Sequence, residues 1–257
     1  MLKNTLIIDN DIRYVNNLKN KIEKNLNLTY KIHNDFNSID TIEDIDAYDL
    51  YFIRLNTLTI PLIDKLSDED KIIIVLTNKY DDKTRSIILS LGVSDYIITD
   101  NNSHGNIALN IVNRLINNSK LTVMLVDDSS LILNTLSIML DTQNLNYIRC
   151  KNGQEAWEYL NKPDNKTIDL VISDYEMPNM NGYELTKRIR TKYSKEILPI
   201  LILSGTEENS MIAKFLKAGV NDYIPKPFIN EEFVNRVANT LTTLELNRKL
   251  NLTHFFD

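Results

Sequence analysis

Five polar side chains follow four of the five apolar runs in the second half of the chain. They lie in the stretches MLVDDS, LVISDYEMPNMNG, LILSG and DYIPKPF, and they are Asp127, Asp128, Asp174, Ser204 and Lys226. Each run has the length of a strand that is buried on both faces. Polar residues beyond the carboxyl ends of parallel strands meet at one edge of the sheet. We therefore expect these five side chains to converge, because neighbouring strands lie only about 5 Å apart.

Such a group of side chains predicts phosphoryl chemistry. At an effective dielectric constant near 20, two carboxylates about 4 Å apart repel by about 4 kcal/mol, so three of them require a cation. Mg²⁺ binds a few carboxylates and keeps several waters, which suits this set. The positive charge of Lys226 and the hydroxyl of Ser204 could then hold a phosphoryl group on Asp174, because an aspartate carboxylate can act as a nucleophile.

Each residue also has an ordinary structural interpretation. Asp128 or Ser129 could be no more than the N-cap of a following helix. Lys226 lies between two prolines and could be a solvated turn residue. The conjunction of all five, in order and at matching ends of four predicted strands, favours the functional interpretation, which no single residue would support.

Strand and helix patterns alternate around these residues. Amphipathic helical stretches are predicted around Leu131–Leu140, Glu184–Tyr193 and Met211–Ala218. Five alternations predict a parallel sheet with helices on both faces. The predicted strands are Val123–Val126, Tyr147–Ile148, Ile168–Ile172, Ile200–Leu203 and Tyr223–Ile224.

The first half of the chain repeats this order. LGVSDYI at 91–97 matches AGVNDYI at 218–224, and LIIDND at 6–11 matches MLVDDS at 124–129. We therefore predict two tandem α/β domains, over 1–118 and 119–245, followed by a helical tail over 246–257. A closing helix over Asn106–Ile116 would lead directly into the second domain. The strand runs of the first half are Leu6–Ile8, Leu28–Ile32, Leu50–Ile53, Ile72–Leu76 and Tyr96–Ile98.

Composition limits the binding partners and the cellular compartment that can be expected for this chain. The net charge of −6 and the lack of a basic half disfavour direct nucleic-acid binding. The single cysteine, Cys150, cannot form an internal disulfide or a zinc site, which fits a reducing compartment. The apolar stretch near the amino terminus is too short for a signal peptide, and no apolar run has the length of a membrane span. We expect a soluble cytoplasmic protein.

The second half, over about residues 120–245, resembles the CheY-like receiver domains of two-component response regulators. The resemblance implies two doubly wound (βα)5 flavodoxin-like domains in tandem, each with five parallel strands. It implies Asp174 as phospho-acceptor and Asp127 and Asp128 as Mg²⁺ ligands, with the backbone carbonyl of Glu176 as a further ligand. Lys226 would bind the phosphoryl group, and a cis bond is expected before Pro227.

The resemblance also implies a switch and partners. A histidine kinase or phosphotransfer protein would present a phosphohistidine to Asp174, after which Ser204 and Tyr223 would change position. The changed surface would control a homodimer or an output by population shift. Candidate residues for charged contacts across that dimer are Lys214, Lys217, Asp222 and Arg236, although each could equally be a solvated surface charge.

Residues equivalent to the pocket are altered in the first half. Asp49–Arg54 aligns with Asp169–Asp174, so Arg54 stands in place of the phospho-acceptor. An arginine cannot accept a phosphoryl group there and disfavours Mg²⁺, so this domain resembles a degenerate receiver. The predicted degenerate pocket consists of Asp9, Asn10, Arg54, Thr77 and Thr99, with Tyr96 at the position of Tyr223.

Arg54 ends an apolar strand, where an unpaired charge would be costly. We expect it to act as an internal counter-ion for Asp9, and for Asp11 as a second candidate, because its planar guanidinium engages carboxylates bidentately.

Two receivers followed by a long helix resemble the arrangement of PleD-like diguanylate cyclase response regulators. This favours a regulatory part of a cyclic di-GMP signalling protein, with the cyclase itself outside these residues. The runner-up is a stand-alone tandem receiver that binds a target protein when phosphorylated. An aspartyl-phosphate phosphatase ranks lower, because no second general acid is visible, and a purely structural pair conflicts with the intact five-residue set.

Overall fold

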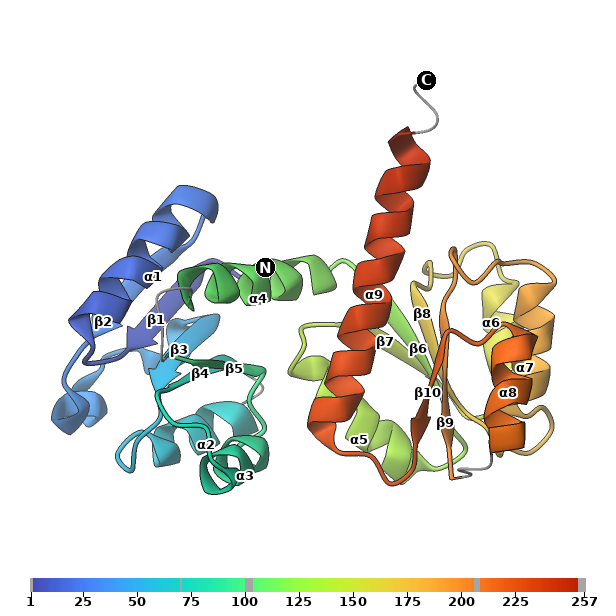
Figure 1. Ribbon diagram of the computed structural model, residues 1–257, viewed down its shortest axis with the longest axis horizontal. Coiled ribbons are helices and arrows are strands. Elements are labelled where there is room, and N and C mark those ends of the chain that lie inside the picture. Colours follow the sequence, from blue (N-terminus) through green and yellow to red (C-terminus); the bar gives the residue numbers. More distant parts are fainter. Residues whose placement is uncertain (1, 70, 100–103, 206–208, 254–257) are drawn as a thin grey trace. The chain divides into compact units, whose positions relative to one another are not determined.

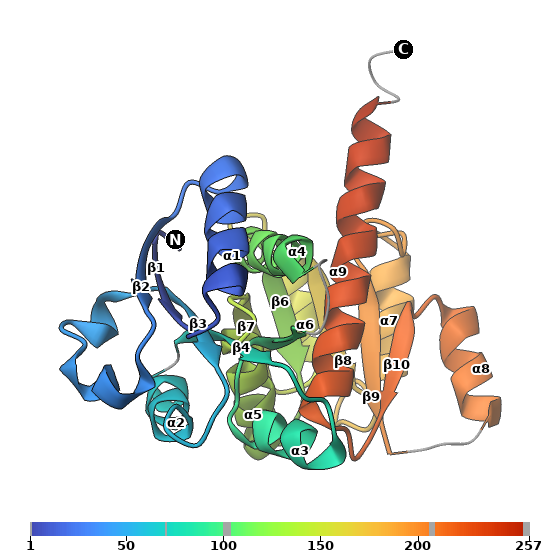
Figure 2. The same ribbon diagram turned by 60° about the vertical axis from the view of Figure 1, so that its left-hand side comes forward.

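The computed structural model describes residues 2–69, 71–99, 104–205 and 209–253 (Figures 1 and 2). The chain divides into two compact units. Unit 1 comprises Met1–Ser119 with Asp141–Asn144, and unit 2 comprises Lys120–Leu140 with Leu145–Asp257.

Unit 1 is built on a five-stranded parallel sheet in the order β2-β1-β3-β4-β5. Continuous apolar runs form its central strands because both faces of the sheet are covered. The strands are β1 (Asn4–Ile8), β2 (Thr29–His33), β3 (Leu50–Arg54), β4 (Ile72–Thr77) and β5 (Asp95–Ile98). The α-helices are α1 (Ile12–Asn25), α2 (Ile60–Asp68), α3 (Asp82–Ser90) and α4 (His104–Asn118).

Two apolar layers cover this sheet. Leu18 of α1 and Val112 of α4 pack with Phe52 of β3 on one face. Ile63 of α2 and Ile88 of α3 pack on the other. The two helix layers lie on opposite sides of the strands in Figure 2. This is the doubly wound arrangement that the sequence predicts.

The connection between β2 and β3 departs from the expected (βα)5 pattern. It contains two 3₁₀ helices, η1 (Phe36–Thr41) and η2 (Ile45–Ala47), instead of an α-helix. The carboxylate of Asp35 accepts a hydrogen bond from the backbone N–H of Asn37, and the hydroxyl of Ser38 donates to the carbonyl of Asp35. Local side-chain bonds of this kind compete with the helical backbone pattern. Repulsion between the many carboxylates of this segment also disfavours a regular helix.

Unit 2 has the same sheet, with the order β10-β9-β8-β6-β7. Its strands are β6 (Thr122–Val126), β7 (Asn146–Cys150), β8 (Leu170–Asp174), β9 (Ile200–Ser204) and β10 (Asp222–Pro225). Its helices are α5 (Ser130–Asp141), α6 (Gly153–Leu160), α7 (Gly182–Arg190), α8 (Asn209–Ala218) and α9 (Asn230–Thr253). One apolar layer joins the sheet to α5 and α9, and the other joins it to α6, α7 and α8, on opposite sides of the sheet in Figure 1.

Element boundaries differ from the sequence predictions mainly at polar positions. β8 begins at Leu170 rather than Ile168, and it continues through Ser173 to Asp174. The ladder extends because Asp174 still pairs with Leu203 of β9. Helix α7 spans Gly182–Arg190 instead of Glu184–Tyr193, and α4 extends beyond Asn106–Ile116 at both ends.

The predicted tail is continuous with the last helix of unit 2. α9 runs 24 residues to Thr253, so residues 246–253 extend a helix whose earlier turns bury Val237, Leu241 and Leu244. The guanidinium of Arg248 donates to Asp169 at 2.7 Å, which ties the extension to the amino-terminal edge of the sheet. The last four residues of the predicted tail, 254–257, lie outside the described residues. Within the described helices, none combines the length and the apolar character that a membrane crossing requires.

Candidate functional site

The five predicted residues of unit 2 lie at the carboxyl ends of four strands. Asp174 and Ser204 end β8 and β9, while Asp127 and Lys226 directly follow β6 and β10. Ligand oxygens of Asp127, Asp128 and Asp174 lie within 4.8 Å of one another. We call Asp127, Asp128, Asp174, Ser204 and Lys226 the carboxylate pocket.

Lys226 balances part of the negative charge in this pocket. Its ammonium group donates to Asp174 Oδ1 at 2.8 Å and to Asp127 Oδ2 at 3.2 Å. Burial lowers the pKa of Lys226, but its hydrogen bonds and charge interactions with Asp174 and Asp127 outweigh burial and raise the pKa overall. Lys226 therefore stays charged at neutral pH and is not a solvated turn residue.

Asp174 is a largely buried carboxylate beside Lys226. Its side chain is 11% exposed. Burial raises its pKa above the ordinary carboxyl value, and the neighbouring charge of Asp127 adds to this, while Lys226 lowers it. Burial and like charge disfavour the ionised form, so a cation that binds Asp174 relieves a cost already present in the fold.

The three carboxylates are better explained as ligands of a divalent cation than as caps of a helix. Ser129 provides the cap of α5, because the Ile132 N–H approaches Ser129 Oγ at 3.4 Å. Asp127 Oδ1 accepts from the backbone N–H of Ser129 at 2.9 Å, which fixes the carboxylate. Asp128 is exposed and has no described hydrogen bond. The set would therefore supply hard oxygen ligands to Mg²⁺ and leave room for its waters.

The backbone around Asp174 is held by the start of α7. A Cβ atom at Gly182 would lie 2.3 Å from the carbonyl oxygen of Asp174, so only glycine fits there. Asn181 caps α7 in a capping box with Glu184. Tyr175, the next residue after Asp174, packs edge-to-face on Phe215 of α8, with ring centroids 5.0 Å apart. Neither Gly182 nor Phe215 was predicted as a site residue, since neither is a polar residue that follows a strand.

The predicted switch residues lie in the neighbouring strands β9 and β10. Ser204 is buried, and its carbonyl accepts from the backbone N–H of Lys226 at 2.8 Å. Tyr223 is half-buried, and the guanidinium of Arg236 lies 6.0 Å from its ring centroid. The peptide bond between Lys226 and Pro227 is cis, as expected. Glu176 is exposed two residues beyond Asp174, and the role of its carbonyl stays a prediction.

Two of the candidate dimer residues pair with each other within unit 2. Arg236 donates to Asp222 at 2.7 Å and to Glu232 at 3.0 Å. Lys214 and Lys217 have no ion pair with any described residue. The four candidates therefore do not form one uniform charged surface.

Unit 1 reproduces the backbone of this site. Equivalent hydrogen bonds join the strand ends in both units and confirm the alignment of the two halves. The Asp9 N–H donates to the carbonyl of His33 in unit 1, as the Asp127 N–H donates to that of Cys150 in unit 2. Likewise, the Thr99 N–H donates to the carbonyl of Thr77, as the Lys226 N–H donates to that of Ser204. Arg54 and Asp174 occupy the last position of strands β3 and β8.

In unit 1, the side chain of Arg54 occupies the position equivalent to the carboxylate pocket of unit 2. Its Nε donates to Asp9 Oδ1 at 3.0 Å, and its Nη2 donates to Asp9 Oδ2 at 2.7 Å. This is the bidentate pair that the sequence predicts. The sequence did not indicate the third bond, from Nη1 to Thr99 Oγ1 at 2.5 Å, or the Tyr14 ring, 5.5 Å from the guanidinium carbon. These contacts come from other elements and have no signature near Arg54.

The remaining predicted residues of unit 1 have other contacts. Asp11, the second candidate partner of Arg54, caps α1 by accepting from the N–H groups of Arg13 and Tyr14. Thr77 donates to the carbonyl of Lys79 at 2.9 Å. Asn10 is exposed at the position equivalent to Asp128. Unit 1 thus has one carboxylate and a fixed guanidinium where unit 2 has three carboxylates.

Comparisons with known proteins agree with this geometry. The family model described as response regulator receiver domain matches residues 123–238. A chemotaxis protein CheY homolog of Campylobacter jejuni is 34% identical over 125 residues, which cover 47% of this chain and 92% of that protein. Chemotaxis protein CheY1 of Helicobacter pylori is also 34% identical over 125 residues and 97% covered. Both alignments span about half of this chain.

Solved structures match a larger part of the chain. The crystal structure of a putative two-component system response regulator/GGDEF domain protein is similar over 95% of this chain and 99% of that chain, with a TM-score of 0.76 and 27% identity. A second structure with a similar title has a TM-score of 0.75 and 27% identity. The tandem arrangement of two parallel sheets is therefore shared with other proteins.

Proposed function

Because this chain belongs to the response regulator receiver family, we propose that unit 2 accepts a phosphoryl group on Asp174 from a phosphohistidine. The donor is a histidine kinase or a phosphotransfer protein in the cytoplasm. The convergence of Lys226, Asp127 and Asp128 on Asp174 is the observation that carries this proposal.

The reaction needs an in-line displacement at phosphorus. One carboxylate oxygen of Asp174 attacks, the P–N bond of the phosphohistidine breaks, and its electron pair stays on the histidine ring. Lys226 already lies 2.8 Å from Asp174 Oδ1, so its ammonium is in place to neutralise the charge that develops on the phosphoryl oxygens. Bound at Asp127, Asp128 and Asp174, with the Glu176 carbonyl as a further ligand, Mg²⁺ would supply the other positive charge.

Ser204 and Tyr223 form the proposed switch. The hydroxyl of Ser204 would donate to the new phosphoryl group, and Tyr223 would turn toward the space that Ser204 leaves. Support comes from Ser204, which ends β9 inside the carboxylate pocket, and from Tyr223, which lies in the neighbouring strand β10 and pairs with Ile202 of β9. The phosphoryl group shifts the population between two states that already exist.

A mass measurement tests phosphoryl transfer. The protein is incubated with Mg²⁺ and a small phosphodonor, and its intact mass and peptides are determined. Wild type should gain one phosphoryl group on Asp174, and Asp174→Asn should gain none. Labelling that persists in Asp174→Asn, or that maps to unit 1, would contradict the assignment.

Unit 1 would take no part in the transfer. Arg54 occupies the acceptor position, and its guanidinium neutralises Asp9, which leaves neither a nucleophile nor a magnesium site. We propose that unit 1 is a degenerate receiver that acts as a scaffold.

The proposed output is control of homodimerisation, as the regulatory part of a diguanylate cyclase. The similarity to proteins titled response regulator/GGDEF domain protein over 95% of this chain supports it. Phosphorylation should then change the molecular mass in solution. The second candidate is a tandem receiver that binds a target protein, which the similarity of unit 2 to chemotaxis proteins favours. A phosphorylated chain that stays monomeric would favour the second candidate.

A further inference from the structure

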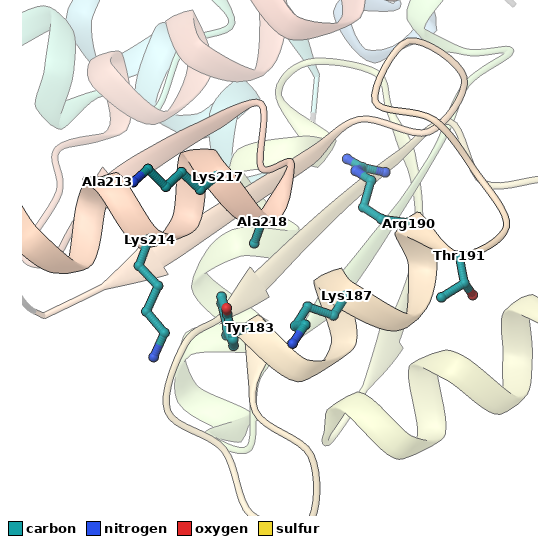
Figure 3. Close-up of a pocket in the computed structure, with 8 residues that line it drawn as sticks. All are labelled: Tyr183, Lys187, Arg190, Thr191, Ala213, Lys214, Lys217 and Ala218. Carbon is teal, nitrogen blue, oxygen red and sulfur yellow. The ribbon is translucent and has the colours of Figure 1, made fainter.

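A basic groove lies on unit 2 between α7 and α8 (Figure 3). It encloses about 630 Å³, and its cations are Lys187 and Arg190 of α7 and Lys214 and Lys217 of α8. The three lysines are exposed, so the groove is open to solvent along its length. An open rim of this kind suits a segment of another protein better than an enclosed small molecule.

Tyr183 holds two of these lysines close together. The ammonium groups of Lys214 and Lys187 lie 4.5 Å and 5.5 Å from the centroid of its ring, so they are at most about 10 Å apart. Figure 3 shows Tyr183 between the two side chains. Cation–π contacts keep both ammonium groups near the ring, but they do not neutralise the charge.

The three lysines of the groove have no counter-ion in the part of the chain that the structure describes. No carboxylate of a described residue lies within 4.0 Å of Lys187, Lys214 or Lys217. Arg190 differs, because its guanidinium already donates to the carbonyls of Gly219 and Leu198 and to the side chain of Asn221. Arg190 therefore fixes the wall of the groove, and the three lysines are available to a partner.

Unit 1 carries a complementary acidic segment. Residues 34–53 include six carboxylates and no lysine, arginine or histidine. Asp40, Glu43 and Asp44 are exposed in and after η1, and no described group pairs with their side chains. The other three have local contacts: Asp35 caps η1, Asp46 pairs with Lys65, and Asp49 accepts from backbone N–H groups.

We propose that the acidic segment of one copy of this chain, around Asp40, Glu43 and Asp44, docks in the Lys187–Lys214–Lys217 groove of a second copy. Three exposed carboxylates without a described partner then meet three exposed ammonium groups that have no carboxylate partner among the described residues. Two copies can make the contact twice if each offers its segment to the other. The inference rests on the proposed homodimerisation and names its surfaces.

The groove is connected to the carboxylate pocket. Helix α7, one wall, begins at Gly182, which packs on the Asp174 carbonyl, and helix α8, the other wall, carries the buried Phe215, which contacts Tyr175. A change at Asp174 therefore reaches both walls through direct contacts. The strength of association should differ between the phosphorylated and unphosphorylated protein.

Charge exchange between copies tests the contact. Variant A is Asp40→Lys with Glu43→Lys, and variant B is Lys187→Glu with Lys214→Glu. Sedimentation measures the dimer dissociation constant with Mg²⁺, with and without a small phosphodonor. We expect A and B alone to weaken the dimer at least tenfold, because like charges then face each other. An equimolar mixture of A and B should restore it, because each A–B contact again joins opposite charges.

The control variant is Lys162→Glu with Lys166→Glu, which changes the net charge as B does at exposed lysines of unit 2 outside the groove. It should dimerise as wild type does, and raised salt should weaken the wild-type dimer. Variants A and B that dimerise as wild type does would overturn the inference, as would an A and B mixture that stays monomeric. A wild type that never dimerises would overturn the proposed dimerisation too, whereas labelling of Asp174 would still stand.

Discussion

Asp174 and Arg54 end equivalent strands, and each determines the electrostatics of its pocket. Around Asp174, two further carboxylates lie within 4.8 Å, and Lys226 offsets only part of their charge. Around Arg54, the single carboxylate of Asp9 is fully engaged by two hydrogen bonds. The first pocket therefore gains from a cation, and the second is already neutral.

Removal of the Arg54 side chain should destabilise unit 1. Arg54→Ala leaves the fully buried carboxylate of Asp9 without its partner, which for a buried pair costs about 3 kcal/mol. Chemical denaturation followed by circular dichroism measures the change. The matched control is Arg13→Ala, because Arg13 is exposed on α1, and its loss should cost less than about 0.5 kcal/mol. An unchanged denaturation midpoint for Arg54→Ala would contradict a stabilising role for the pair.

Replacement of Asp174 should have opposite effects with and without Mg²⁺. Because the folded state raises the Asp174 pKa, it binds this proton more tightly than the unfolded chain does. Ionisation of Asp174 therefore lowers the free energy of unfolding as the pH rises above about 4, the ordinary pKa of a carboxyl group. In a chelator, Asp174→Asn should be more stable than wild type at pH 8, and the difference should shrink toward pH 4.

With saturating Mg²⁺ the order should reverse. A ligand at 100 times its dissociation constant adds about 2.7 kcal/mol, and Asp174→Asn should gain much less than wild type. Urea unfolding followed by Trp157, the single tryptophan and a residue of α6 in unit 2, reports both comparisons. Equal stabilisation of both proteins by Mg²⁺ would place the cation elsewhere.

Residue types at strand ends could be predicted from the sequence, and contacts between elements could not. Asp127, Asp174 and Lys226 each follow a continuous apolar run, and the topology of a parallel sheet then brings them together. The Thr99 and Tyr14 contacts of Arg54 depend on how β5 and α1 pack, which no local spacing encodes.

At the scale of elements, α7 both closes the carboxylate pocket and forms one wall of the basic groove. Gly182 and Tyr183 precede the start predicted from periodicity, because glycine and an aromatic residue are weak helix formers. The capping box of Asn181 and Glu184 sets the true start. The strands were predicted well because continuous apolar runs mark them, but polar ends were missed, and the strands predicted from Leu28 and Ile168 began too early. The 3₁₀ connection of unit 1 was missed because side-chain to backbone bonds decide it.

A methyl group at the start of α7 should disturb the acceptor. In Gly182→Ala the Cβ atom would lie 2.3 Å from the carbonyl oxygen of Asp174, so strand or helix must shift. We expect a loss of about 1–3 kcal/mol in stability and a labelling rate that falls roughly tenfold or more. Asn181→Ala is the control. It removes the N-cap of α7, which should cost about 1 kcal/mol of stability, and it leaves the space at Gly182 unchanged. If Asn181→Ala slows labelling as much as Gly182→Ala does, helix stability rather than acceptor position is responsible.

At the scale of the whole molecule, each unit has a complete core of its own. Apolar layers cover both faces of each sheet, and each strand among the described residues pairs within its own sheet. The two pockets also respond to different chemistry, since one is neutralised by Arg54 and the other requires a cation. These features predict that a mutation or a ligand in one unit leaves the free energy of unfolding of the other unit unchanged. The reason is that distant sites without shared partners have additive effects.

Two optical signals can separate the units during thermal unfolding. Trp157 fluorescence follows unit 2 alone, while circular dichroism follows both units. Arg54→Ala should lower the unit 1 transition by roughly 10 °C and leave the Trp157 midpoint unchanged. Mg²⁺ should raise the Trp157 midpoint and leave the other transition in place, and Asp174→Asn should cancel that rise. A Trp157 midpoint that falls with the Arg54→Ala transition would instead show that unit 2 depends on unit 1 for its stability, and the scaffold would then be coupled energetically to the acceptor.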